Sequence, residues 1–418
     1  MTRSGTPGKT RQPHAPRDPY GIGPVSGFVG PVVAAIGLIL VAALTLSLMN
    51  GDIPFLRNVA PVGANGGNTP DGPTPSPAPS DVVITPPTSI FPGSITYAKA
   101  GNIWVQTGKE VHQITSNGND SMPTFSADGQ WIYFIRIQPD TGKFPTGGFG
   151  GLSWYDLDTP GLWRMKPDGS GAKRLLNGVF RQGSGTWYYF LRQPVPSPDG
   201  KTVAVVSDGP NPLQSDIVLH TFSIAAKTLV SMNLPESLHL GHQDPAWRPD
   251  GRSLLYVQNG RDGNRGAPQI FRYDTATRIA RALTGPGYLA PAWSPDAGSI
   301  AATRTDAFGT DIVILDTTGK ETLRVTDDGH SFSPVWSPAG DAVAFLHLAG
   351  TIVDLRMATL DSSTGHWTVK STVDLTTVSG LDGASRPSWF IPGSVPPTTS
   401  PAPATSGSPA GSAGSAAP

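Results

Sequence analysis

Cysteine is absent from the 418 residues of this chain, and its absence excludes several kinds of protein. Without thiols there can be no disulfide scaffold, thiolate metal site, cysteine nucleophile or lipid-modified N-terminal cysteine. Charged residues are also scarce, at 15% of the chain, against about 25% in an average soluble domain. The 30 basic and 31 acidic side chains give a formal charge of −1, so the basic excess of a nucleic-acid-binding protein is missing. The chain also has 50 glycines and 43 prolines, which leave little room for long soluble helices.

One long hydrophobic run is present near the N-terminus. Val25–Met49 carries no charged residue, and about 20 apolar residues suffice for a helix that crosses a bilayer. The preceding segment, 1–24, is basic, which predicts a cytoplasmic N-terminus and an extracytoplasmic remainder. The alternative is a cleaved signal peptide, which has a shorter apolar region followed by a small-residue cleavage site. We therefore expect a retained transmembrane helix that places the protein in the plasma membrane as a single-pass protein.

Proline-rich segments flank the central region of the chain. Residues 50–92 include the sequence Pro-Thr-Pro-Ser-Pro-Ala-Pro at 73–79, and residues 391–418 contain Pro, Ser, Thr, Ala and Gly without a charge. Such segments cannot bury enough apolar surface to fold. They predict an extended linker and a disordered tail, with the folded domain at 93–390 between them.

The central region contains five copies of an eight-residue sequence and a truncated sixth copy. The copies occupy 122–129, 193–200, 244–251, 290–297, 333–340 and 386–390. Their leading prolines are 43 to 71 residues apart, a period typical of four-stranded propeller blades.

Each copy ends in a turn sequence and is followed by β-prone segments. Pro-Asp-Gly favours a tight turn, and the alternating apolar residues after it indicate strands. The last copy supplies only one strand, whereas three unassigned strands are predicted near the N-terminal end, at 94–97, 102–106 and 111–115. A blade assembled from both ends would close the ring and leave no open sheet edge.

These repeats resemble those of the TolB-type propeller family, whose WD40-like repeats have a Pro-x-Trp-Ser-Pro-Asp-Gly core. The resemblance covers residues 93–390 and implies an all-β, six-bladed propeller of four-stranded antiparallel blades that serves as a protein- or ligand-binding platform. It does not fix one activity, because function depends on sites added to a fold. The chain departs from the core at Phe125 and Pro196 (for tryptophan), Ala297 (for glycine) and Ala339 (for aspartate).

The repeated tryptophans and aspartates are expected to have structural roles. The tryptophans should pack between blades, and the aspartates should hold the turns through local hydrogen bonds. A stacking surface or a catalytic ring made from them is the weaker interpretation. The residues are Trp247, Trp293, Trp336 and Trp389, and Asp128, Asp199, Asp250 and Asp296.

No catalytic motif is recognisable. The sequence nearest to a nucleophile elbow, at 329–333, lacks the final glycine and precedes a repeat rather than a helix. His239, His242 and Asp244 are residue types that bind zinc, but they lie in an expected loop without helical spacing. We therefore expect no catalytic residue, no metal and no cofactor.

The first repeat unit carries two long insertions, an inner loop at 138–161 and an exit segment at 178–192, that are expected to meet on one rim of the propeller. Aromatic side chains in them suit partner binding, because they bury a large area and have few rotatable bonds. The alternative, that these aromatics pack internally or form an extra hairpin, stays open. The predicted binding face comprises Trp154, Tyr155, Trp187, Tyr188, Tyr189, His242, Asp244, Arg261 and Arg265.

These observations predict a monomeric, non-catalytic binding or scaffold module outside the cytoplasm, whose partner is a protein or a glycan of the cell envelope. The alternative is a propeller lyase or hydrolase that acts on envelope or extracellular carbohydrate. A cluster of titratable groups at the central channel would distinguish the enzyme from the binding module.

Overall fold

The computed structural model of the protein describes residues 91–146, 151–182, 185–209, 217–232, 234, 241–258 and 268–394. The expected transmembrane segment Val25–Met49 and the tail beyond Ser394 lie outside these ranges. Within the described ranges, no helix is long and apolar enough to cross a membrane.

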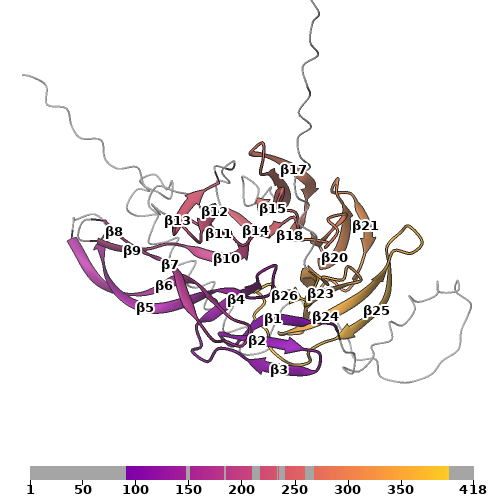
Figure 1. The fold of residues 1–418 in the computed structure, drawn as a ribbon, viewed down its shortest axis with the longest axis horizontal. Helices are drawn as coiled ribbons and strands as arrows, with labels where there is room; N and C mark the ends of the chain where they lie inside the picture. The colour runs from indigo at the N-terminus through magenta and orange to yellow at the C-terminus, as the bar shows by residue number, and fades with distance from the viewer. Residues whose placement is uncertain are drawn as a thin grey trace, which may run out of the picture. The chain divides into compact units, whose positions relative to one another are not determined.

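The described chain is built from strands, which form six four-stranded sheets and one two-stranded hairpin. Five sheets consist of strands that are consecutive in the chain. They are β4 (Asp120–Phe125), β5 (Ile132–Thr146), β6 (Gly151–Met165) and β7 (Lys173–Asn177); β10 (Leu191–Pro196), β11 (Thr202–Ser207), β12 (Val218–Ser223) and β13 (Thr228–Ser231); β14 (His242–Trp247), β15 (Ser253–Gln258), β16 (Gln269–Asp274) and β17 (Ile279–Pro286); β18 (Tyr288–Trp293), β19 (Ser299–Asp306), β20 (Gly309–Asp316) and β21 (Glu321–Arg324); and β22 (Ser331–Trp336), β23 (Ala342–Ala349), β24 (Ile352–Asp361) and β25 (Thr368–Asp374). Figure 1 shows these sheets as blades around a common centre.

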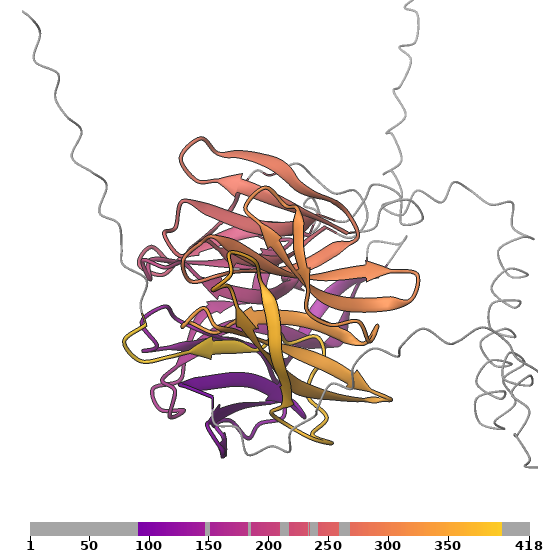
Figure 2. The same cartoon turned by 90° about the vertical axis from the view of Figure 1, so that its right-hand side faces the viewer.

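The sixth sheet joins the two ends of the folded region. Its order is β26 (Ser388–Phe390), β1 (Ser94–Lys99), β2 (Asn102–Thr107) and β3 (Glu110–Gln113). β26 and β1 are antiparallel, with Ile95 opposite Trp389. The indigo N-terminal strands and the yellow C-terminal strands accordingly lie side by side in Figures 1 and 2. The predicted six-bladed propeller with a shared blade is confirmed.

Close contacts of the final strand with its neighbours hold the shared blade together. The Trp389 indole donates a hydrogen bond to the Pro92 carbonyl at 2.8 Å and lies edge-on to Phe91, with ring centroids 5.6 Å apart. A Cβ on Gly129 would lie 2.2 Å from the Phe390 ring. Glycine in the first turn therefore lets the final strand approach the next blade.

The buried apolar side chains lie between blades. One cluster, for example, joins the β14–β17 sheet to the β18–β21 sheet through Leu255, Ile270, Ile300 and Val313, each 0% exposed. Six such clusters occur among the described residues, one at each junction of neighbouring blades. The period-2 pattern of the strands explains this arrangement, because each sheet presents a face to the blade on either side.

The first insertion differs from the loop that the sequence suggested. Residues 138–161 fall almost entirely within β5 and β6, which pair without a register shift from Ile132–Met165 to Thr146–Gly151. Threonine and aromatic residues along this stretch favour extended backbone, so the insertion lengthens the strands. The second insertion contains a hairpin, β8 (Val179–Gln182) and β9 (Gly185–Tyr188), and β9 lies against β5 and β6.

The turns after the innermost strands repeat one hydrogen-bonding pattern. The Ser126 hydroxyl donates to the Asp128 carboxylate at 2.6 Å, and the same carboxylate oxygen accepts the Gln130 amide at 3.0 Å. Equivalent contacts link Ser197 to Asp199 and Ser294 to Asp296. The aspartates of the repeats thus fix the turns locally.

Ala297 keeps the turn geometry although it replaces a glycine. Its φ is 58°, close to the 67° and 72° of Gly200 and Gly251 at equivalent positions. A left-handed conformation costs an L-residue about 1–2 kcal/mol. Ala297→Gly should therefore raise the free energy of unfolding by about 0.5–1 kcal/mol.

Gly251→Ala is the matched reverse change, because a Cβ there would meet nothing within 4 Å and only the backbone conformation is tested. We expect it to lower the free energy of unfolding by a similar amount. Urea denaturation of both variants measures the two effects. A loss of stability in Ala297→Gly would contradict this account of the turn.

Closure of the ring predicts that the final strand is essential. A chain ending at Pro387 lacks β26 and the Trp389 contacts. The shared sheet then has no innermost strand, and the ring of blades is no longer closed. We expect it to be unfolded, or to melt at least about 10 °C lower, since about 1 kcal/mol corresponds to 2–4 °C in a domain of this size. The control chain, ending at Ser394, should melt as the full chain does when followed by circular dichroism. Equal melting of all three chains would refute closure by a shared blade.

Candidate functional site

The innermost strand of five blades carries the same irregularity. Pairing shifts register within each of these strands, for example between Gln243 and Ala246. The residue just before the leading proline has a positive φ of 50° to 54°, which non-glycine residues rarely adopt. We call the six residues at this position the ring residues; they are Met122, Gln193, Asp244, Ala290, Ser333 and, in the shared blade, Arg386.

Hydrogen bonds connect neighbouring ring residues. The Asp244 amide donates to Gln193 Oε1 at 2.8 Å, and Gln193 Nε2 donates to Asp244 Oδ1 at 2.7 Å. The Ala290 amide donates to Asp244 Oδ2 at 3.0 Å. Side chains of one blade thus satisfy backbone amides that the irregular strand of the next blade leaves unpaired.

Arg386 reaches across the channel to the opposite side of the ring. Its Nη1 donates to the Pro291 carbonyl at 3.0 Å, and its Nη2 lies 3.6 Å from Asp244 Oδ1, an ion pair longer than a hydrogen bond. Nη2 is buried and has no hydrogen-bond acceptor among the described residues. Burial lowers the pKa of Arg386, and Asp244 opposes that shift, yet a guanidinium stays protonated at neutral pH.

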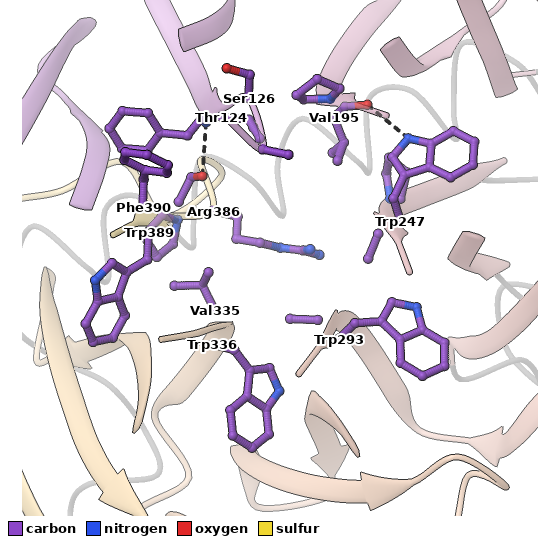
Figure 3. A pocket seen from close by; sticks show the side chains of 18 of the residues that line it. Thr124, Ser126, Val195, Trp247, Trp293, Val335, Trp336, Arg386, Trp389 and Phe390 are labelled. Atoms are coloured by element: carbon purple, nitrogen blue, oxygen red, sulfur yellow. Dashed lines mark hydrogen bonds between the residues drawn. The ribbon is translucent and has the colours of Figure 1, made fainter. Parts of the chain in front are cut away.

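All ring residues except Ala290 border a cavity of about 320 Å³ in the central channel. We call the end near the Pro-Asp-Gly turns the turn end, and the opposite end, where the blades are linked, the rim end. Strand direction places Ala384 at the rim end and Ala127 and Ser394 at the turn end, and all three line the cavity. Figure 3 shows Arg386 extending through the middle of this space.

The part of the cavity between Arg386 and the turn end, called the funnel below, has mainly apolar walls. Tryptophans and prolines from the repeats surround it; they are Trp247, Trp293, Trp336, Trp389, Pro198, Pro249, Pro295 and Pro338. Among the described residues that line the whole cavity, Asp244 and Arg386 are the two with charged side chains. The repeated tryptophans therefore both pack between blades and form the funnel wall (Figure 3).

The four tryptophans of the funnel differ in whether the indole N–H group has a hydrogen-bond acceptor. Trp247 Nε1 donates to the Val195 carbonyl at 3.2 Å, and Trp389 donates to Pro92 as described above. Trp293 and Trp336 are 8% and 4% exposed, and their Nε1 atoms find no acceptor in the described part of the chain. Like Arg386 Nη2, both atoms are buried out of reach of the open space of the cavity, so a ligand there would not contact them.

The structure describes the residues predicted for the rim only in part, and the two insertions that carry most of them meet, since β9 lies against β5 and β6. Trp154 is 68% exposed on β6, with the Lys143 ammonium 4.9 Å from its ring centroid. Tyr155, Trp187 and Tyr188 lie in β6 and β9, and only their backbone is described. Tyr189 is half-buried, and its burial and the Asp208 carboxylate raise its pKa.

His242 and Asp244, which were predicted for the same face, are not exposed. His242 is 1% exposed and packs on Tyr256, with ring centroids 4.9 Å apart. Asp244 belongs to the ring, because the register shift turns it into the channel. Arg261, Arg265 and His239 lie outside the described residues. Within the described ranges, no three metal-ligating side chains come together.

Sequence reasoning missed Arg386, Gln193 and the funnel. The available signal was positional, since these residues directly precede the leading proline of each repeat. Nothing in the residue types themselves indicated that this position faces the channel. The sequence analysis therefore placed the binding face at the insertions.

A serine, a histidine and an aspartate meet in the β22–β25 blade without forming a catalytic triad. His347 Nδ1 lies 3.2 Å from both Ser331 Oγ and Asp328 Oδ2. A triad requires the base to contact the nucleophile and the acid through different ring nitrogens. Ser331 is also 0% exposed, and burial lowers the pKa of His347, as does the nearby Arg356. The cluster is therefore a buried packing feature.

Comparisons with known proteins identify the architecture. No family model matches the chain. An uncharacterized protein of Agrobacterium fabrum is 27% identical over 163 residues, which cover 37% of this chain and 45% of that protein; the chain spans less than half of that relative. The crystal structure of TolB from Acinetobacter baumannii aligns with a TM-score of 0.50 at 17% identity, over 71% of this chain and 66% of TolB.

A provisionally assigned TolB from Agrobacterium tumefaciens gives the same TM-score of 0.50 and identity of 17%, over 74% of this chain and 96% of that one. At such identities the likeness shows the fold alone. The chain is therefore an all-β, six-bladed propeller that is structurally similar to the propeller of TolB.

The ring predicts unequal effects of its two charged residues on stability. Asp244→Ala removes the acceptor of Gln193 and Ala290 and leaves Arg386 without a counter-ion, so we expect a loss of about 3–5 kcal/mol. Arg386→Met leaves Asp244 with two donors and should cost about 1–2 kcal/mol. Urea denaturation measures both, and the double variant should be less destabilised than the sum. Additive losses would contradict direct coupling across the channel.

Proposed function

We propose that this protein is a non-catalytic binding module that receives an extended segment of a partner protein in the funnel. Val25–Met49 anchors it in the plasma membrane, with the propeller outside the cytoplasm, and the basic segment 1–24 supports that orientation. The observation that carries the proposal is the wall of the funnel, which consists mainly of tryptophan and proline side chains.

This wall specifies what a ligand has to bring. An apolar surface favours apolar ligand groups, because a polar group that enters it without a hydrogen-bond partner costs free energy. Asp244, the carboxylate of the cavity, already accepts from Gln193 and Ala290. The site therefore favours a ligand with apolar surface and few hydrogen-bond donors.

An extended peptide meets this requirement better than a glycan. Sugar rings bring a hydroxyl donor at nearly every carbon, and each would need an acceptor in the funnel. A peptide that contains proline brings carbonyl acceptors and fewer N–H groups, and aromatic-lined grooves are known to bind such segments. A volume of about 320 Å³ is at the lower end of ligand pockets, which suits a narrow extended chain.

The channel also supports binding better than catalysis. General acid–base chemistry needs a titratable group with a pKa near neutrality. Of the described residues that line the cavity, those with ionisable side chains are Asp244 and Arg386, and the ring interactions hold both. Because these contacts hold the Asp244 and Arg386 side chains in place, the two residues suit recognition of a ligand that binds in one position.

Titration of a fluorescently labelled proline decamer into the full chain in mild detergent tests the proposal. Ala127 and Ala384 line opposite ends of the cavity, so Ala127→Trp blocks the turn end and Ala384→Trp serves as its matched control. We expect Ala127→Trp and Arg386→Met to weaken binding by at least about fivefold, equivalent to about 1 kcal/mol, and Ala384→Trp to change it by less than twofold.

Trp154→Ala distinguishes the funnel from the insertions, because its side chain is exposed on β6 and contributes nothing to the cavity. It should leave binding of the decamer unchanged. Loss of binding in Trp154→Ala with normal binding in Ala127→Trp would place the site at the rim. Binding of chitin hexasaccharide in preference to the decamer would overturn the peptide proposal.

A further inference from the structure

We infer that the funnel has an internal competitor, the proline-rich segment 396–403 of this same chain, which docks there and restricts access of the partner. The inference rests on the proposed function, since it concerns regulation of the same site. It is argued from where the described chain ends, from the composition of the segment and from the apolar, aromatic wall of the funnel.

The described chain ends at the mouth of the funnel. After β26 the chain turns, and the Ser394 amide donates to the Ile391 carbonyl at 3.1 Å. Ser394 itself lines the cavity at the turn end. Segment 396–403 begins two residues later and therefore needs no linker to reach the opening.

The segment has sufficient length to fill the funnel. Its sequence is Pro-Pro-Thr-Thr-Ser-Pro-Ala-Pro. In the polyproline II conformation eight residues span roughly 25 Å, at about 3.1 Å each. The innermost strands that form the funnel wall have six residues, for example β14 and β18, and span about 20 Å. A chain that enters beside Ser394 can therefore extend to Arg386.

The chemistry of the segment complements the apolar wall. Four of its eight residues are prolines, which have no backbone N–H that would need an acceptor. None of its side chains is charged, so entry into an apolar space carries no charge-desolvation cost. The tryptophans of the funnel provide an aromatic surface, and aromatic-lined grooves bind polyproline II segments.

Segment 396–403 is also the best match within the tail. Residues 404–418 contain two prolines among serine, alanine, threonine and glycine, a composition typical of flexible coil. The preformed backbone of a proline-rich segment lowers the entropy lost on docking. The remainder of the tail thus lacks the feature on which the inference depends.

Tethering makes a weak interaction effective. A segment attached by a short connection has an effective concentration of about 1 mM. If its intrinsic dissociation constant is about 0.1–0.5 mM, it weakens binding of an external peptide about 3- to 10-fold. An external partner must then bind tightly, or be present in excess, to displace it.

Competition with the labelled proline decamer tests the inference in three chains. They are the full chain, the chain ending at Ser394, and the full chain with P396S, P397S, P401S and P403S. Removal of the tail and loss of its prolines should each tighten decamer binding about 3- to 10-fold. Equal affinities in all three chains would refute docking of the segment and leave the proposed function intact. Failure of the decamer to bind any of them would instead refute the proposed function and, with it, competition for that site.

Cross-linking locates the segment directly, because the natural chain has no cysteine and introduced cysteines are the only reactive thiols. A bismaleimide should join A127C to S400C at least about threefold faster than A384C to S400C. The quadruple serine variant, with the same tail length, provides the matched control for A127C/S400C. Faster linkage at Ala127 that falls to control level in the serine variant supports the inference. Equal rates at Ala127 and Ala384, or a rate unaffected by the serine changes, overturn it.

Discussion

Burial of apolar side chains between neighbouring blades is the interaction on which the whole structure depends. Each sheet contributes residues such as Leu255 and Ile300 to a shared cluster and has no core that it completes alone. Since the clusters occur at every junction, the ring must close before every blade has both of its partners. The shared blade meets this requirement, because β26 and β1 join the ends of a chain that would otherwise expose two sheet faces.

The same requirement determines the form of the central channel. The leading proline of each repeat is buried, and the tryptophans that follow it in four copies pack between blades. In five blades a register shift accompanies the residue before the proline, which has a positive φ. Asp244 and Gln193 thus face the channel because of this backbone geometry, and their side chains accept hydrogen bonds from amides that the irregularity leaves unpaired.

The sequence predicted the fold because the repeat signals its structure at several levels. The turn motif, the strand pattern after it and the surplus strands at 94–115 all indicated a closed six-bladed ring. The candidate site was predicted less well. The positive φ of residues such as Asp244 accompanies a register shift within the innermost strand, and the types of these residues, which are not glycine, did not indicate it. The insertion at 138–161 was misread as a loop because its strand character depends on long pairing between β5 and β6.

Within the eight-residue repeated sequence, the ring position is the one at which all six copies differ: Met, Gln, Asp, Ala, Ser and Arg. The next position is proline in every copy, and packing and turn formation restrict the positions after it to a few residue types. Substitution at a ring residue changes the chemistry of the channel while the blades around it keep their fold. A propeller of this kind can therefore diverge in specificity through its ring, although hydrogen-bonded residues such as Gln193 and Asp244 have to change together.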